Sequence, residues 1–284
     1  MKNPSAWITG AGGLIGSHLV QAATKHALQW RVIPVSRERV DLCDFGAVER
    51  LFADEKPQLI IHCAAISRVA DCQTNPELAD AVNVRATRHL CELAIEIPFY
   101  FFSTDLVFDG LKGGYVETDP VNPLNVYAET KVRAEEWVLR NPRHCVVRTS
   151  LNAGVSPTGN RSFTEDMCRA WERGQTLSLF TDEYRNPIPA GATARAVWEL
   201  VQAGRSGLYH LAGAERLSRW EIGEMLARRW SHLQARMDAS SLSEYQGPKR
   251  SPNTSLNCDK IQSLLTFQLP GLRDWLEKNP HDPI

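Results

Sequence analysis

The chain has 284 residues, of which 43% are hydrophobic and 23% charged, and its formal net charge is -1. This length suffices for one α/β domain with an attached lobe or for two compact units. A net charge so close to zero creates no global field to attract a polyanion, so we expect no nucleic-acid partner. No apolar stretch is long enough to cross a bilayer, so we expect no membrane partner.

The cysteines and histidines form no recognisable structural or metal-binding pattern. The seven cysteines are scattered and include no C-x-x-C pair, which argues against a disulfide framework and against a zinc knuckle. The eight histidines never pair at i,i+4, so we expect no metal site. The N-terminus lacks the basic and apolar regions of a signal peptide. These features together predict a cytoplasmic protein.

The first half alternates short apolar runs with helical patterns, which is typical of βαβ units. The predicted buried strands are Ala6–Gly10, Trp30–Val35, Gln58–Cys63, Pro98–Ser103 and Cys145–Arg148. The predicted helices between them are Leu14–Lys25, Phe45–Asp54, Glu77–Ile95 and Val126–Leu139. The predicted fold class is therefore α/β, a Rossmann-type doubly wound parallel sheet.

The alternation of apolar runs with helical patterns ends after residue 150. A loop rich in Gly, Pro and Asn at Asn152–Arg161 precedes helices that begin with capping boxes at Ser162 and Ser218. We therefore predict a dinucleotide-binding domain over residues 1–150 and a smaller α/β substrate lobe over residues 151–284. A helix and a strand within residues 190–212 are expected to return to the main sheet.

A glycine-rich turn follows the first predicted strand and opens the first predicted helix. In the segment Gly10-x-x-Gly13-Leu14-Ile15-Gly16, the glycines let the backbone bend sharply and approach a pyrophosphate at the helix N-terminus. A plain tight turn would use the same glycines, but strand, turn and helix together favour a dinucleotide site. The spacing resembles that of the extended short-chain dehydrogenases/reductases.

The end of the second predicted strand indicates which dinucleotide is bound. Ser36 and Arg37 stand where an NAD-specific protein usually has an acidic residue for the ribose 2′-hydroxyl. A hydroxyl and a guanidinium suit a 2′-phosphate instead, and the alternative for Arg37 is a solvated loop residue. We therefore favour NADP(H) and leave NAD(H) open.

Tyr127 and Lys131 are four residues apart and thus share one face of a predicted helix. A nearby lysine ammonium is expected to favour the phenolate and to bring the tyrosine pKa closer to neutrality. Thr104, at the end of the fourth strand, is expected to hydrogen-bond a substrate carbonyl while Tyr127 protonates it. Ser103 is the alternative hydroxyl. These residues predict carbonyl reduction, with Thr104, Tyr127 and Lys131 as the catalytic set.

These motifs resemble those of the dTDP-4-dehydrorhamnose reductase family and its sugar-nucleotide-binding relatives. The resemblance rests on Ser-Thr-Asp-x-Val-Phe-Asp-Gly from Ser103, Pro-Leu-Asn-x-Tyr-x-x-x-Lys from Pro123, and Arg-Thr-Ser from Arg148. It implies reduction of a ketone on a nucleotide-linked deoxysugar with NAD(P)H. It also implies cofactor contacts at Asp41, Leu42, Cys63, Ala64, Ala65, Asn83 and Ser103, in addition to Tyr127 and Lys131.

The substrate region departs from the family pattern. Leu151 follows Arg-Thr-Ser where the family has a tryptophan, and Arg185 adds a positive charge to the lobe. Arg185 and Arg250 are candidate ligands of a phosphate or a carboxylate, and a surface position is the alternative for each. The expected substrate contacts are Thr104, Asp105, Leu151, Arg185 and Arg250.

Two other functions remain open at this stage. A sugar-nucleotide epimerase would bind the same dinucleotide; a dehydratase would need a second carboxylate after Asp105, where the chain has Leu106. A non-catalytic NADP-binding regulatory subunit, resembling the β subunit of methionine adenosyltransferase, has the same fold. A homodimer is also left open, since dimers are the commonest assembly.

Overall fold

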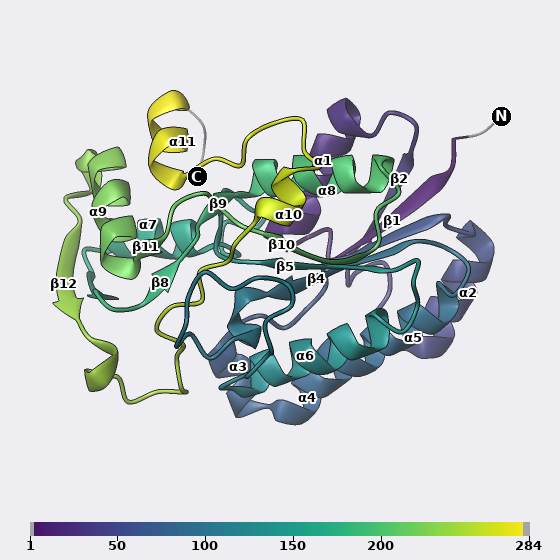
Figure 1. Cartoon of the computed structure of the whole chain (residues 1–284), viewed down its shortest axis with the longest axis horizontal. Coiled ribbons are helices and arrows are strands. Elements are labelled where there is room, and N and C mark those ends of the chain that lie inside the picture. The colour runs from purple at the N-terminus through teal and green to yellow at the C-terminus, as the bar shows by residue number, and fades with distance from the viewer. Residues whose placement is uncertain (1–2, 281–284) are drawn as a thin grey trace.

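The computed structural model describes residues 3–280, and its centre is a six-stranded parallel sheet (Figure 1). The strand order is β10-β5-β4-β3-β1-β2. The strands are β1 (Ser5–Thr9), β2 (Arg31–Val35), β3 (Leu59–His62), β4 (Phe99–Thr104), β5 (Cys145–Thr149) and β10 (Gly207–Leu211). The chain runs from β1 outward to β2 and then returns to β3 on the other side of β1. The predicted doubly wound sheet is confirmed, and its switch point lies between β1 and β3.

Helices cover both faces of the sheet, as Figure 1 shows. The helix α1 (Leu14–His26) packs with α8 (Ala190–Gln202) on one face. The helices α2 (Phe45–Glu55), α5 (Ala86–Leu93) and α6 (Val126–Val138) cover the other face. Side chains alternate between the two cores along each strand because the strand is pleated. In β3, Leu59 and Ile61 enter the first core, and Ile60 enters the second.

The predicted helix Glu77–Ile95 is not a uniform α-helix. It consists of α4 (Pro76–Asp80), one π-helical turn η1 (Ala81–Arg85) and α5, and a further short helix α3 (Val69–Thr74) precedes it. A π turn adds one residue to the helical repeat and is frequent at functional sites. The inserted turn contains Asn83, which faces the loop after β3.

The lobe has a hydrophobic core of its own, distinct from the two cores of the sheet. Its helices α7 and α9 begin at the predicted capping boxes, in which Ser162 pairs with Glu165 and Ser218 with Glu221. Its elements are α7 (Phe163–Glu172), β7 (Thr176–Phe180), β8 (Tyr184–Arg185), β11 (Leu217–Ser218), α9 (Arg219–Arg229), η3 (Ser231–Leu233), β12 (Arg236–Ser240), η4 (Leu242–Glu244) and α11 (Leu272–Lys278).

The strand β10, the helix α8 and the segment around α10 (Asp259–Gln262) all come from the second half of the chain and pack with the main sheet. The strand β10 pairs in parallel with β5, and α8 lies on α1. The segment around α10 also contributes Ile261 and Leu269 to the first core, although the sequence placed these residues with the lobe. The short strands β6 (Asn152–Ala153) and β9 (Ile188–Pro189) pair where the chain passes between the two parts.

Within residues 3–280, no helix is both long enough and apolar enough to span a membrane.

Candidate active site at the carboxyl edge of the sheet

The glycine-rich turn lies at the switch point, where the ends of β1 and β3 meet. Gly10 has a φ of +67°, and a Cβ atom there would lie 2.6 Å from the Ala64 backbone nitrogen. A Cβ on Gly16 would lie 2.3 Å from the Gly10 carbonyl oxygen. Only glycine fits either position, so these glycines let the turn fold tightly onto itself and against the end of β3.

The first turn of α1 is available to an anionic group. Gly13 caps the helix and donates its N–H to the Gly10 carbonyl oxygen at 2.8 Å, but no described side chain caps the helix. The free amides and the helix dipole both favour negative charge. The turn therefore fits a dinucleotide pyrophosphate, and Leu14 and Ile15 follow it as the first two residues of α1.

The predicted ribose-phosphate residues lie at the end of β2. Ser36 is partly buried, whereas the Arg37 side chain is 86% exposed. The guanidinium contacts the Asp41 carboxylate at 3.5 Å, and Asp41 also accepts a hydrogen bond from the Cys43 backbone. Leu42 packs on the edge of the second core. The exposed ion pair with Asp41 is weak, so the Arg37 guanidinium can turn to bind a phosphate.

The small residues after β3 are positioned by contact with the glycine turn. The Cys63 N–H donates to the Thr9 carbonyl oxygen at 3.2 Å, and the Ala64 backbone lies against Gly10. Cys63, Ala64 and Ala65 are all partly buried. A side chain at position 10 would separate the two strand ends, because it would meet the backbone of Cys63 and Ala64.

Asn83 is buried and uses its side-chain amide within the chain. Its Oδ1 accepts the Ile66 N–H at 2.9 Å, and its Nδ2 donates to the Ile66 carbonyl oxygen and to Thr130 Oγ1, both at 3.0 Å. It thereby fixes the loop after β3 to α6. We therefore revise its expected role from cofactor contact to positioning residue.

The predicted catalytic residues converge at the end of β4. Tyr127 and Lys131 are on the first turns of α6, which begins where Asn125 accepts the Ala128 N–H at 3.1 Å. Both side chains are buried, and Tyr127 lies close enough to Thr104 for the Thr104 hydroxyl to favour its phenolate. The Lys131 ammonium lies 3.9 Å from the centroid of the Phe101 ring. The three residues therefore gather at the carboxyl end of β4, and Lys131 is also near Cys63 at the end of β3.

Burial dominates the titration of this cluster. It raises the pKa of Tyr127 above its ordinary value, while the nearby Thr104 hydroxyl acts in the opposite direction. Burial lowers the pKa of Lys131 to about 7, although Glu135 opposes the change. The expectation that Lys131 brings the pKa of Tyr127 toward neutrality is wrong for the chain by itself, because desolvation of the phenolate is the larger effect.

Ser103 contributes an unsatisfied polar group to the same place. Its Oγ is buried and has no hydrogen-bond partner among the described residues. Buried hydroxyls normally find a partner, so a lone one at the carboxyl end of a strand indicates a position where a ligand completes the hydrogen bonding. With the glycine turn, this is the second observation that fits a dinucleotide.

The predicted substrate residues Asp105 and Arg185 use their charged groups to bind other residues of the protein. The Asp105 carboxylate accepts hydrogen bonds from Ser150 at 2.7 Å and Thr254 at 2.9 Å. The Arg185 guanidinium lies 3.6 Å from Asp105 and 3.1 Å from Glu183, and it also donates to two backbone carbonyls. Arg185 is 4% exposed. We therefore revise the expected role of Arg185 from ligand to positioning residue.

Leu151 and Arg250 lie on the lobe side. Leu151 is partly buried and packs on the lobe core. Arg250 is paired with Glu183 at 3.0 Å, yet its side chain keeps 31% exposure. Of the two arginines chosen from the sequence, Arg250 is the one with surface left for a ligand.

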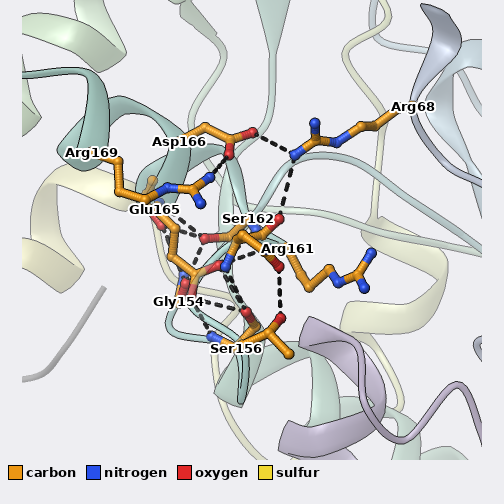
Figure 2. Close-up of polar contacts among 11 residues, drawn as sticks. Arg68, Gly154, Ser156, Arg161, Ser162, Glu165, Asp166 and Arg169 are labelled. Atoms are coloured by element: carbon orange, nitrogen blue, oxygen red, sulfur yellow. Dashed lines mark hydrogen bonds and ion pairs between the residues drawn. The ribbon is translucent and has the colours of Figure 1, made fainter. Parts of the chain in front are cut away.

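A loop of the lobe is built around the buried carboxylate of Glu165 (Figure 2). Glu165 accepts hydrogen bonds from the backbone N–H groups of Ser156, Arg161 and Ser162, at 2.6, 2.7 and 2.9 Å. Sequence reasoning found the bond to Ser162 as a capping box. It missed the other two, since they depend on how the loop folds back over the helix end.

This loop joins the lobe to the cofactor side of the sheet. A Cβ on Gly154 would lie 3.2 Å from His18 and 3.4 Å from Leu14, so the loop touches α1 beside the glycine turn. In Figure 2, Arg68 reaches the loop from the segment after β3 and pairs with Asp166 at 3.5 Å. The loop therefore bounds the candidate cofactor site on the lobe side.

The fold and the site define the class of protein: an extended short-chain dehydrogenase/reductase with a Rossmann sheet. Residues 5–280 match the family described as the RmlD substrate binding domain, and the chain belongs to this family.

Curated relatives cover nearly the whole chain. It is 31% identical to a probable low-salt glycan biosynthesis reductase of Haloferax volcanii, with 95% of each chain covered. It is 28% identical to the dTDP-4-dehydrorhamnose reductase of Aggregatibacter actinomycetemcomitans, with 92% of this chain and 93% of the relative covered. It is 29% identical to methionine adenosyltransferase 2 subunit beta of Xenopus laevis, with 91% and 82% covered.

Solved structures share the fold over the same length. A hypothetical dTDP-4-dehydrorhamnose reductase from Sulfolobus tokodaii superposes with a TM-score of 0.84 at 28% identity, covering 95% of this chain and 97% of that one. The dTDP-4-dehydrorhamnose reductase of Bacillus anthracis in complex with NADP has a TM-score of 0.88 at 22% identity, covering 98% of both chains.

Proposed function

We propose that the protein is an NADPH-dependent reductase of a ketone on a nucleotide-linked deoxysugar, of the dTDP-4-dehydrorhamnose reductase kind. The observation that carries this proposal is the buried cluster of Thr104, Tyr127 and Lys131 at the carboxyl end of β4, on the same edge of the sheet as the glycine turn. The similarity to reductases of Haloferax volcanii and Aggregatibacter actinomycetemcomitans supports it.

The cofactor would be held along the carboxyl edge of the sheet. The turn from Gly10 to Gly16 would bind the pyrophosphate, and Ser36 and Arg37 would bind a ribose 2′-phosphate. The Ser103 hydroxyl would gain its missing partner nearby. NADP(H) is the favoured dinucleotide, in agreement with the NADP held by the Bacillus anthracis reductase, and NAD(H) is the weaker alternative.

Each catalytic residue has a separate task. The chemistry that bound NADPH supplies is hydride for the carbonyl carbon. Thr104 donates a hydrogen bond to the carbonyl oxygen, and Tyr127 donates the proton that this oxygen needs. With a pKa of about 7, Lys131 exchanges protons at neutral pH and is one helical turn from Tyr127, so it can help to restore the Tyr127 proton.

The proposal is tested by incubating the protein with NADPH and dTDP-4-dehydrorhamnose, following NADPH absorbance and identifying the sugar product. We expect NADPH consumption together with reduction at the keto carbon. Conversion of the sugar without net NADPH consumption would instead indicate an epimerase.

A regulatory subunit is the second candidate, because the chain is similar over most of its length to methionine adenosyltransferase 2 subunit beta. Such a subunit would bind NADPH and leave it unconsumed with every keto sugar tested. The same incubation, paired with a direct NADPH-binding measurement, therefore separates the two functions.

A further inference from the structure

Five buried polar side chains join the glycine turn to the first turn of α6. We call them the polar network, and they are Thr9, His62, Thr87, Asn83 and Thr130. None of them is more than 3% exposed. The network begins at Thr9, which directly precedes Gly10, and it ends at the backbone of Tyr127. It therefore connects two parts of the candidate site that lie on different elements.

His62 is the centre of the polar network. Its Nδ1 lies 2.6 Å from Thr9 Oγ1, and its Nε2 lies 3.0 Å from Thr87 Oγ1. The imidazole ring also stacks on Phe101 with an interplanar angle of 24°, and the Lys131 ammonium contacts the same Phe101 ring. His62 thus bridges the end of β1 and the helix α5, and it packs on the ring that Lys131 contacts.

The partners of His62 determine which of its nitrogens carries the proton. The Thr87 hydroxyl has one hydrogen, which it donates to the Asn83 carbonyl oxygen at 2.8 Å. The Nε2 of His62 must therefore donate to Thr87, and its Nδ1 must accept the hydrogen of the Thr9 hydroxyl. Burial, with a smaller contribution from Lys131, lowers the pKa of His62 to about 3, so the ring is neutral near pH 7.

The network continues from Asn83 into the catalytic helix. The Asn83 side chain donates from Nδ2 to Thr130 Oγ1 at 3.0 Å, and the Thr130 hydroxyl donates to the Tyr127 carbonyl oxygen at 2.7 Å. The hydrogen bonds therefore end at the carbonyl oxygens of Asn83 and Tyr127, which have no hydrogen to pass on. It follows that the network does not conduct protons and that its effect is to hold groups in place.

Stability alone does not require such a network. Burying hydroxyls, an amide and an imidazole costs free energy that their hydrogen bonds largely offset, and apolar side chains of the same shape would avoid that cost. What fully satisfied buried polar groups add is a single arrangement of the elements that carry them. The elements joined here carry the glycine turn at one end and Tyr127 at the other.

We propose that His62 is a positioning residue that holds Tyr127 at a fixed place relative to the glycine turn. This inference rests on the proposed function, in which Tyr127 must meet a ketone that lies against the cofactor. The Nδ1 of His62 fixes the turn through Thr9, and its Nε2 fixes the catalytic helix through Thr87 and the rest of the network. The two nitrogens therefore have separate effects, Nδ1 on NADPH affinity and Nε2 on turnover.

The test separates the two nitrogens by substitution. An Asn side chain places its amide oxygen near the Nδ1 position, whereas a Gln side chain places its amide nitrogen near the Nε2 position. His62→Asn therefore keeps the acceptor for Thr9 and loses the donor to Thr87, and His62→Gln does the reverse. We expect His62→Asn to lose about tenfold in kcat through misplacement of Tyr127 and to bind NADPH within about twofold of wild type.

His62→Gln should show the opposite pattern. We expect its NADPH affinity to fall by about five- to tenfold, the effect of one lost hydrogen bond, while kcat stays within about threefold of wild type. Thr87→Val removes the contact with Nε2 from the other side and should reproduce the result of His62→Asn. It also tests that contact if His62→Asn does not fold.

His144 provides the matched control. It is 1% exposed, as His62 is, and both rings contact that of Phe99. His144 directly precedes β5 and therefore lies at the opposite edge of the sheet. We expect His144→Asn and His144→Gln to lower the melting temperature as the His62 variants do, and to leave both kcat and NADPH affinity unchanged.

Backbone hydrogen exchange gives a second measurement that needs no turnover. In the protein without NADPH, His62→Asn should speed exchange by about fivefold in residues 126–131 and leave residues 10–17 unchanged. His62→Gln should speed exchange in residues 10–17 and leave residues 126–131 unchanged. The location of the faster exchange therefore shows which element each nitrogen holds.

The outcomes separate this inference from the proposed function. If the wild-type protein turns over no keto sugar, the reductase is overturned, and the exchange pattern with the NADPH affinities still decides the role of His62. If His62→Asn and His62→Gln change kcat and NADPH affinity alike, or change neither, the positioning role is overturned and the reductase stands. The same kinetic losses in the His144 variants would also overturn it, because they would reflect general destabilisation.

Discussion

In the sheet half of the molecule, the candidate site is made from short stretches of chain at the ends of neighbouring strands. In the lobe half, it is made from single charged residues that come from distant segments. Gly10, Gly13 and Gly16 lie within seven residues, whereas Glu183 meets Arg250 across 67 positions. Backbone geometry stabilises the sheet half of the site, and buried ion pairs stabilise the lobe half. The two halves should therefore fail differently when they are altered.

The largest effect on stability is expected in the lobe. Glu183→Gln keeps the shape of the side chain but removes the charge that Arg185 and Arg250 share. Breaking such a buried pair costs about 3–5 kcal/mol, because uncompensated cations remain. Urea unfolding measures the loss. Glu215→Gln, which removes a half-exposed pair with Arg273 at 3.8 Å, is the control and should cost less than about 1 kcal/mol. If Glu183→Gln and Glu215→Gln lowered the free energy of unfolding equally, buried ion pairs would not be what stabilises the lobe half.

A smaller effect is expected when the glycine turn is altered. Gly10→Ala introduces a Cβ into the Ala64 backbone at a φ of +67°, which should cost about 1–3 kcal/mol and abolish NADPH binding. Gly12→Ala meets nothing within 4 Å, so it should leave the melting temperature unchanged. Thermal melts and an NADPH titration distinguish the two variants. A Gly10→Ala protein that is as stable as Gly12→Ala would show that the close approach to Ala64 is unimportant.

These two regions also mark what the sequence could and could not predict. The sheet and the turn were predicted because glycine spacing, strand periodicity and the Tyr127–Lys131 interval are local signals. The capping boxes at Ser162 and Ser218 were local as well. By contrast, the pairing of Arg185 with Glu183 and of Glu183 with Arg250 depends on which segments meet in space, and no spacing rule predicts that. The raised pKa of Tyr127 was missed because burial cannot be read from a motif.

The contribution of Lys131 to the free energy of unfolding is expected to depend on pH. Its pKa falls from the ordinary value to about 7 on folding, so the unfolded chain binds more protons between pH 7 and about 10. Burying the Lys131 ammonium therefore destabilises the folded protein fully below pH 7, and this destabilisation disappears as the pH rises toward 10. Lys131→Met should be more stable than wild type at pH 6, by about 1–2 kcal/mol after local relaxation.

That advantage should shrink steadily between pH 7 and 9, as measured by melts across the range. Lys278→Met is the control, because Lys278 is 70% exposed on α11, and its effect should not vary with pH over this range. An advantage of Lys131→Met that stays constant from pH 6 to pH 9 would contradict the lowered pKa.

The smallest effect is expected at the exposed end of β2. Arg37→Ala should weaken NADPH binding by about five- to tenfold and leave NADH binding unchanged, because only NADPH carries the 2′-phosphate. Arg39→Ala, two residues along, should change neither affinity, since Arg39 is paired with Glu55. A parallel loss of NADPH and NADH in Arg37→Ala would remove the basis for favouring NADPH.

The proposed reductase function is tested most directly by the turnover of Tyr127→Phe with NADPH and dTDP-4-dehydrorhamnose. Tyr209→Phe, a buried tyrosine in β10 outside the catalytic cluster, is the control. We predict that Tyr127→Phe binds NADPH as wild type does and loses about 10²–10⁴-fold in kcat, because the carbonyl oxygen loses its proton donor. Turnover within about threefold of wild type would contradict the assignment of Tyr127 as the catalytic acid.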